Sequence, residues 1–138
     1  MSSHQKSSTI AELAWKDELV FTGRSGETRL VLDSDAKAGP SPMQMLALSL
    51  AGCMSMDVVH ILKKGRHNLR GLQVRIVGRR AHEPPKRFVS VDLHFTVTGQ
   101  VPIAQVERAV DLSRETYCSV WQSMRQDIEL RVTTEVQP

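Results

Sequence analysis

Cysteine and aromatic residues are scarce in this sequence of 138 residues, which has two cysteines and only 4% aromatic residues. Two cysteines without a CxxC motif do not supply the four ligands of a structural zinc site, and the five histidines show no metal-ligand spacing. The few aromatic residues and the net charge of +3 also disfavour a surface that binds single-stranded nucleic acid. We therefore expect no bound cofactor, no metal and no nucleic-acid partner.

Long apolar runs and low-complexity tracts are also missing. The uncharged stretch over residues 43–56 is shorter than the roughly 20 apolar residues that a membrane-spanning helix needs. The polar residues 1–8 contain no apolar segment of a signal peptide. We expect a cytoplasmic protein without a membrane partner, in which residues 1–8 form a disordered tail and residues 9–138 form a single domain.

The first third of the chain alternates between short apolar segments and turn residues. Residues 9–15, 19–22 and 28–32 are predicted to be the strands of a β-meander. Gly23-Arg24-Ser25-Gly26 is predicted to form the turn before the third strand.

A long helix is predicted from Pro42 to about Lys64. Ser41 can cap its start, with proline at the first helical position. Lys63 and Lys64 favour the negative end of a helix, and Gly65 can take the left-handed position that ends it.

Apolar residues occupy every side of this helix, not one stripe, which predicts burial all round. They are Met43, Met45, Leu46, Leu48, Leu50, Met54, Met56, Val58 and Ile61. One other helix and one sheet would leave part of this surface uncovered. A second subunit is therefore expected to cover it, which predicts a homodimer.

The remaining pattern completes an α+β domain. Residues 72–76 and 89–97 alternate with period two and predict half-buried strands, and residues 128–136 predict a final strand. Between them, apolar residues recur at three or four positions from Ile103 and predict an amphipathic helix that falters close to Cys118. The expected fold is a long buried helix and a second helix packed against an antiparallel sheet.

The two cysteines have a plain interpretation as small buried hydrophobic residues, a common fate of free cysteine in cytoplasmic proteins. His60 follows Cys53 by seven residues and falls on nearly the same helix face, which permits a Cys/His nucleophile. Two helical turns separate them by about 10 Å, however, so a direct hydrogen bond is not expected. A histidine that finds a partner near the helix end is the simpler interpretation.

The sequences around the cysteines change this weighting. Ser41-Pro42-Met43-Gln44-Met45-Leu46 running to Gly52-Cys53, and then Tyr117-Cys118, resemble the OsmC/Ohr family of thiol peroxidases in motif, spacing and order of elements. The resemblance spans residues 9–136. Gly39-Pro40-Ser41-Pro42-Met43 and Tyr117-Cys118-Ser119 resemble its short YhfA-like subgroup. This resemblance implies an OsmC-like fold and an intertwined homodimer with active sites at the subunit interface.

The resemblance also implies a reaction. Cys53 takes the place of the peroxidatic cysteine, whose thiolate attacks an organic hydroperoxide, and Cys118 takes the resolving place, where it condenses with the sulfenic acid to a disulfide. An external dithiol, a lipoyl protein in related peroxidases, then restores the enzyme. The expected function is hydroperoxide reduction in protection against oxidative stress.

Two alternatives stay open. A redox sensor would use the same cysteine pair without rapid peroxide turnover. A binding protein with little peroxidase activity would instead hold a small apolar ligand, for which the methionines at positions 43, 45, 54 and 56 could line a pocket. Ordinary core packing is the simpler interpretation of these methionines.

The peroxidase interpretation needs a Cys53 thiolate near neutral pH. Cys53 lies about ten residues inside its helix, beyond the reach of the helix dipole, so we predict that an arginine lowers its pKa. The family uses an arginine held by a glutamate, and Thr22-Gly23-Arg24-Ser25-Gly26 resembles the family's arginine segment. Arg24 is therefore the candidate, beside the alternative of an ordinary turn arginine.

The sequence departs from the family at the glutamate. Its position holds Met43, followed by the neutral Gln44, and Asp57, one turn beyond Cys53, would oppose a thiolate. This departure leaves the expected fold unchanged and puts the rate of peroxide reduction in doubt.

Overall fold

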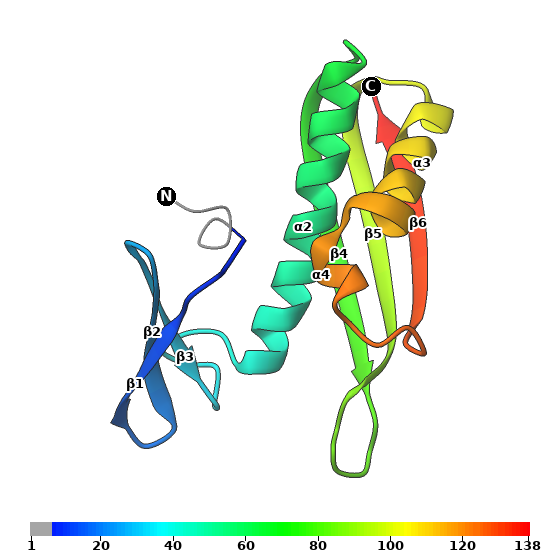
Figure 1. Ribbon diagram of the computed structural model, residues 1–138. Coiled ribbons are helices and arrows are strands. Elements are labelled where there is room, and N and C mark those ends of the chain that lie inside the picture. Colours follow the sequence, from blue (N-terminus) through cyan, green and yellow to red (C-terminus); the bar gives the residue numbers. More distant parts are fainter. Residues whose placement is uncertain (1–6) are drawn as a thin grey trace. The chain divides into compact units, whose positions relative to one another are not determined.

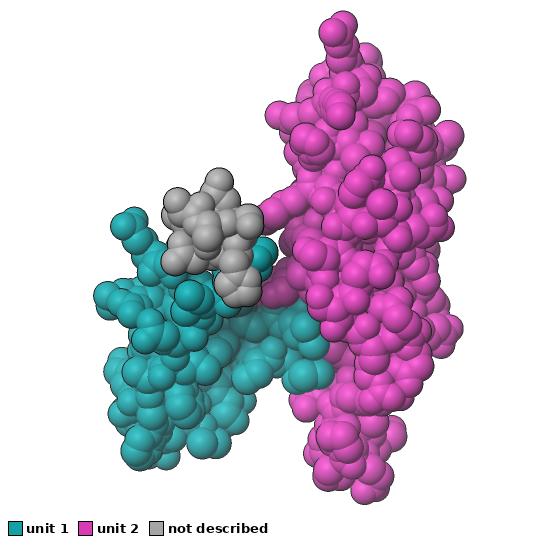
Figure 2. Space-filling view, in the orientation of Figure 1, with its two compact units in different colours: residues 1–46 teal, residues 47–138 magenta. Residues whose placement is uncertain are grey.

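The computed structural model describes residues 7–138, so most of the tail predicted over residues 1–8 lies outside the described residues. The chain divides into two compact units, one up to Leu46 and the other from Ala47 onward, which Figure 2 colours separately. Their boundary falls inside the long predicted helix.

The first unit is the predicted β-meander. Strands β1 (Glu12–Asp17), β2 (Val20–Ser25) and β3 (Thr28–Asp33) pair antiparallel in that order (Figure 1). The turn predicted from Gly23 is wrong, because β2 continues through Arg24 to Ser25. The chain reverses at Gly26 instead, whose φ of 60° suits a residue without a Cβ atom.

The long helix, α2, spans Pro42–Lys64 and has the predicted bounds. Its start is held by two reciprocal hydrogen bonds. The Gln44 backbone N–H donates to Ser41 Oγ over 3.2 Å, and the Ser41 N–H donates to Gln44 Oε1 over 3.0 Å. This capping box satisfies backbone donors that the first helical turn leaves free.

The end of α2 differs from the prediction in one residue. Arg66, with a φ of 62°, takes the left-handed position that was expected of Gly65. The Arg66 N–H donates to the Lys63 carbonyl over 2.9 Å, and the His67 N–H donates to the Leu62 carbonyl over 3.1 Å. These two bonds form the usual closing pattern of a helix. The left-handed residue of the pattern lies one position later than Gly65.

Burial on α2 is limited to one stripe, so the expectation of burial on every side is wrong for the single chain. The buried residues are Leu50, Ala51, Met54, Val58 and Leu62, whereas the side chains of Leu48 and Met56 are 58% and 74% exposed. By length and composition alone α2 could cross a membrane, a test that core helices of soluble proteins also pass.

The second unit contains a sheet of three strands, β4 (Asn68–Arg80), β5 (Phe88–Gln100) and β6 (Glu129–Gln137), in that order. The first two pair antiparallel, but β6 runs parallel to β5, so the prediction of an all-antiparallel sheet is wrong at its last strand. A parallel neighbour requires a crossover, which the helical segment between β5 and β6 provides.

The core of this unit lies between the sheet and its helices. Both α3 (Ile103–Leu112) and the second-unit part of α2 lie on one face of the sheet (Figure 1). Alternate β5 residues are fully buried, as the period-two pattern predicts, among them Leu93, Phe95 and Val97.

A break separates α3 from the residues that follow. The helix widens into one π-helical turn, η1 (Ser113–Tyr117), and Cys118 is extended, with φ −72° and ψ 100°. A short helix, α4 (Ser119–Gln122), begins immediately afterwards. This break is where the sequence predicts the second helix to falter.

Candidate active site

The structure brings the two cysteines together, although 65 residues separate them in the sequence. Cys53 lies on α2 with a partly exposed side chain, and Cys118 is buried at the break between η1 and α4. The Cys118 thiol is a hydrogen-bond partner of Cys53. Both belong to the second unit, so this pairing rests on the packing of α2 against the segment after α3.

Cys118 acts as the N-cap of α4. Its extended backbone allows Sγ to accept a hydrogen bond from the Trp121 N–H over 3.3 Å. This places a sulfur where serine or aspartate oxygen caps most helices. The first backbone N–H groups of α4 therefore face the cysteine pair.

The surroundings of Cys53 favour its thiolate. Burial would raise the pKa of the Cys53 thiol, but hydrogen bonds from the Val120 N–H, the Cys118 thiol, and the Ser119 hydroxyl and N–H together hold that pKa below its ordinary value. The Ser119 Oγ lies 3.9 Å from Cys53 Sγ. A thiolate here sits against the positive end of α4, where free N–H groups stabilise negative charge.

Cys118 has the opposite tendency. Burial, and then the proximity of Cys53, raise the pKa of the Cys118 thiol to about 11, although the Trp121 N–H opposes this. Cys118 therefore stays protonated near neutral pH and can donate a hydrogen bond to the Cys53 thiolate. The two sulfurs form an unequal pair, with one nucleophile and one reserve thiol.

These donors lower the pKa of Cys53 without the arginine that the sequence predicts for that role, and they leave that prediction untested. The dipole of α2 is indeed too remote, but a second and much shorter helix supplies N–H groups from outside. Sequence reasoning missed these donors because α4 has four residues and no helical periodicity. The sequence indicates these donors only through Ser119, which belongs to the Tyr117-Cys118-Ser119 motif.

Asp57 and Ser113 tie the segment before Cys118 to α2. The fully buried Ser113 hydroxyl donates to Asp57 Oδ2 over 2.7 Å, and the Cys118 N–H donates to the Ser113 carbonyl over 2.8 Å. Ser113 therefore links the helix that carries Cys53 to the backbone that carries Cys118. Nothing in the local sequence indicates this pair, because Asp57 and Ser113 are 56 residues apart in the chain.

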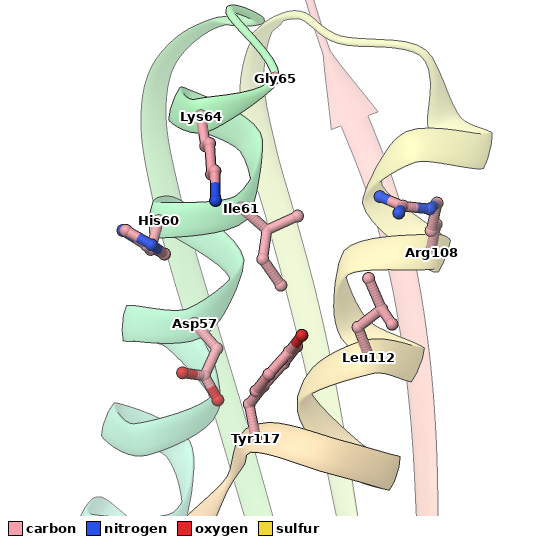
Figure 3. Close-up of a pocket in the computed structure, with 8 residues that line it drawn as sticks. All are labelled: Asp57, His60, Ile61, Lys64, Gly65, Arg108, Leu112 and Tyr117. Atoms are coloured by element: carbon pink, nitrogen blue, oxygen red, sulfur yellow. The ribbon is translucent and has the colours of Figure 1, made fainter.

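A cavity of about 660 Å³ lies in the second unit, between α2 and the segment formed by α3 and η1 (Figure 3). Asp57 is one of the residues that line it. His60, the alternative catalytic residue, lines it together with Asp57 and Tyr117. No ring nitrogen of His60 is hydrogen-bonded to Cys53 among the described residues, so the geometry does not favour a Cys/His nucleophile.

The OsmC-like protein family model matches residues 33–133, which include both cysteines and all of α2. The chain belongs to the OsmC family. It is also 38% identical over 130 residues to the protein YhfA of Escherichia coli K12, a match that covers 91% of this chain and 96% of YhfA. The predicted resemblance is thereby confirmed.

Solved structures of this OsmC-type fold agree. A hypothetical protein from Aquifex aeolicus VF5 superposes with a TM-score of 0.88 at 28% identity, covering 94% of this chain and 96% of that one. An organic hydroperoxide resistance protein OsmC from Legionella pneumophila superposes with a TM-score of 0.71 at 20% identity, covering 94% and 97%. The predicted α+β OsmC-like fold is confirmed by these likenesses.

Arg24, the third predicted site residue of this OsmC-family chain, lies on β2 in the first unit. Its Nη2 donates to Glu12 Oε1 over 2.8 Å, and both side chains are at least half exposed. The arginine therefore has a glutamate partner, but on the neighbouring strand β1 and not at Met43. The role of Arg24 toward Cys53 stays a prediction.

Met54 and Met56, two of the methionines predicted as a possible pocket lining, differ in burial. Met54 is fully buried in the core of the second unit, and Met56, two residues later on α2, is 74% exposed. Ordinary core packing accounts for Met54. The cavity between α2 and α3 is lined by other residues.

Proposed function

We propose that this OsmC-family protein reduces organic hydroperoxides through Cys53 and Cys118. The observation that carries the proposal is the unequal pair, in which hydrogen bonds lower the pKa of Cys53 while burial keeps the neighbouring Cys118 protonated. Peroxidatic chemistry needs one thiolate that attacks and one thiol within reach that resolves. The fold shared with organic hydroperoxide resistance proteins adds support.

The reaction has two thiol steps. The Cys53 thiolate attacks the terminal peroxide oxygen, the O–O bond breaks, and the alkoxide takes a proton and leaves as an alcohol, so that Cys53 becomes a sulfenic acid. Cys118 sulfur then attacks the sulfenic sulfur, and its proton leaves with the hydroxyl group as water. The product is a disulfide between Cys53 and Cys118. Ser119 and the α4 N–H groups stabilise the starting thiolate.

An external dithiol closes the cycle by thiol–disulfide exchange, which returns two electrons to the cysteines. The family resemblance points to a lipoyl protein as that dithiol, and to the cytoplasm, where reduced thiols are maintained. In this cycle the two cysteines of the chain carry the electrons, and the dithiol belongs to the reductant.

A homodimer is part of this proposal. Apolar side chains of the first unit, namely Ile10, Leu13, Trp15 and Leu19, are more than 60% exposed, and so is Met56 on α2. These side chains provide apolar surface that a second subunit could bury, which supports a dimer. Sedimentation velocity at micromolar concentration is expected to give twice the chain mass, and a stable monomer would contradict this part.

The catalytic proposal is tested with one equivalent of cumene hydroperoxide added anaerobically to the reduced protein. Both thiols are expected to disappear within seconds, with a mass loss of about two daltons for one disulfide. Cys118→Ala is expected to stop at a sulfenic acid on Cys53 that dimedone traps. Cys53→Ser is the control that retains Cys118 and should consume no peroxide.

Persistence of both thiols for minutes in the parent protein would refute the proposal. Disulfide formation followed by no further peroxide consumption in excess dihydrolipoate would instead favour the redox sensor, because a sensor cycles without turnover. Equal peroxide consumption by Cys53→Ser would show that the cysteine pair is not the reactive site.

A further inference from the structure

The cavity between α2 and α3, which neither cysteine lines, has an unequal distribution of charge along its length. Its α2 wall carries Asp57, His60, Ile61 and Lys64. Counted from Cys53, these residues follow at four, seven, eight and eleven positions, so they continue the helix face on which Cys53 lies. The cavity therefore begins one helical turn from the thiol and extends toward the end of α2.

Two cations face each other at the end farther from Cys53. Lys64 reaches in from the last turn of α2, and Arg108 reaches in from α3 on the opposite wall (Figure 3). Within residues 7–138, neither side chain has a carboxylate or hydrogen-bond partner. Lys64 also favours the negative end of its helix, but that explanation does not extend to Arg108, which lies in the middle of α3.

The end nearer Cys53 has the opposite charge, and the middle is apolar. The Asp57 carboxylate lies there, bonded to the Ser113 hydroxyl, and Tyr117 closes that side. Ile61 and Leu112 line the stretch between the two ends from opposite walls (Figure 3). A volume of about 660 Å³ is within the range of small-molecule sites.

We infer that this cavity binds an amphipathic organic anion, with its negative group between Lys64 and Arg108 and its apolar part over Ile61 and Leu112. Asp57 repels an anionic group from the other end, so the charges also fix the direction of the ligand. The apolar end then points toward Tyr117 and the cysteine pair. From Asp57 to Lys64 the helix rises about 10 Å, which an extended chain of eight to ten carbons matches.

This inference concerns binding and does not require the proposed peroxidase reaction. The test is calorimetric titration of the reduced protein with decanoate below its micelle concentration, repeated with Cys53→Ser to exclude thiol chemistry. Saturable one-site binding of decanoate is expected for both. The neutral 1-decanol should bind at least fivefold more weakly, because it lacks the ion pairs with Lys64 and Arg108, which add modestly to affinity. Decylammonium should bind more weakly still, because the two cations repel it.

Variants locate the site. Lys64→Gln combined with Arg108→Gln should raise the dissociation constant for decanoate about fivefold or more and leave that for 1-decanol unchanged. Lys64→Gln alone should also weaken decanoate binding, and Lys63→Gln is its matched control, since Lys63 has the same charge at the same helix end but does not line the cavity. Lys63→Gln should change the constant less than twofold.

Three results would overturn the inference. They are the absence of saturable decanoate binding, equal affinity for decanoate and 1-decanol, and an effect of Lys63→Gln as large as that of Lys64→Gln. Because no peroxide is present, each of these results is separate from success or failure of the thiol assay.

Discussion

Removal of the Ser113 hydroxyl tests how the unequal cysteine pair is held. In Ser113→Ala, the Asp57 carboxylate loses the hydrogen bond that spans 2.7 Å from a fully buried donor. The backbone bond from Cys118 to the Ser113 carbonyl is retained, since alanine has the same backbone. The substitution therefore removes only the link between η1 and α2.

The expected cost follows from the type of bond. Hydrogen bonds to charged groups contribute about 1.5 to 3 kcal/mol, and water can replace part of this one because Asp57 is only half-buried. We expect a loss of about 1 to 2 kcal/mol in the free energy of unfolding. For a chain of this size, that lowers the melting temperature by roughly 3 to 8 °C.

Reactivity should change together with stability. If the link holds α4 against α2, its loss displaces the Ser119 and Val120 N–H groups from Cys53 and raises the pKa of that thiol. Iodoacetamide alkylation of Cys53 at pH 7, followed by mass spectrometry, should then be slower than in the parent protein. Asp57→Asn keeps an oxygen acceptor and should lose less of both properties.

Ser55→Ala is the matched control. Its hydroxyl donates to the Ala51 carbonyl of the same helix and contacts neither cysteine, so stability should change by less than about 0.5 kcal/mol. The reasoning is refuted if Ser113→Ala melts within a degree of the parent protein and alkylates at the same rate. A loss of stability without a change in alkylation would reduce Asp57 and Ser113 to a purely structural link.

Three further predictions use the same protein. In the parent chain, Cys53 should alkylate at neutral pH. Cys118 should react only as the pH approaches about 11, because its raised pKa keeps the thiol protonated below that. Equal alkylation rates of the two cysteines at pH 8 would contradict this assignment. Cys118→Ala should slow Cys53 alkylation at pH 7 by about three- to tenfold, since one hydrogen bond to the thiolate is lost. Arg66→Gly should raise the free energy of urea unfolding by about 0.5 to 1 kcal/mol, since glycine adopts a φ of 62° without strain; a loss of stability would mean that the arginine side chain contributes there.

Local signals explain which parts of the fold could be predicted. Ser41 and Pro42 mark the start of α2 and Lys63 and Lys64 mark its end, and the period-two strands and the break before Cys118 are equally visible in the sequence. These features depend on residues adjacent in the chain. The capping position is a small exception, because Arg66 accepts a conformation in which glycine was expected.

Features that depend on pairing between distant segments could not be predicted in the same way. The alternation in residues 128–136 identifies a strand but is the same for either direction, so the parallel pairing of β6 depends on the crossover. The apolar residues of α2 likewise do not reveal which side meets the sheet. Within the site, the two cysteines were predicted through resemblance, and the residues that make them unequal were not.

Met43 stands where the OsmC family has a glutamate, and the hydrogen bonds to the Cys53 thiolate change the consequence of that difference. If an arginine alone lowered the pKa of Cys53, a methionine at position 43 would threaten the nucleophile itself. Here the donors that lower the pKa come from α4 and Cys118, all within the second unit. Arg24 keeps a carboxylate partner in Glu12 as well. A low peroxidase rate would therefore indicate poor placement of the peroxide, not an inactive Cys53, and alkylation and peroxide assays on Arg24→Gln would separate the two: the first should be unchanged and only the second should fall.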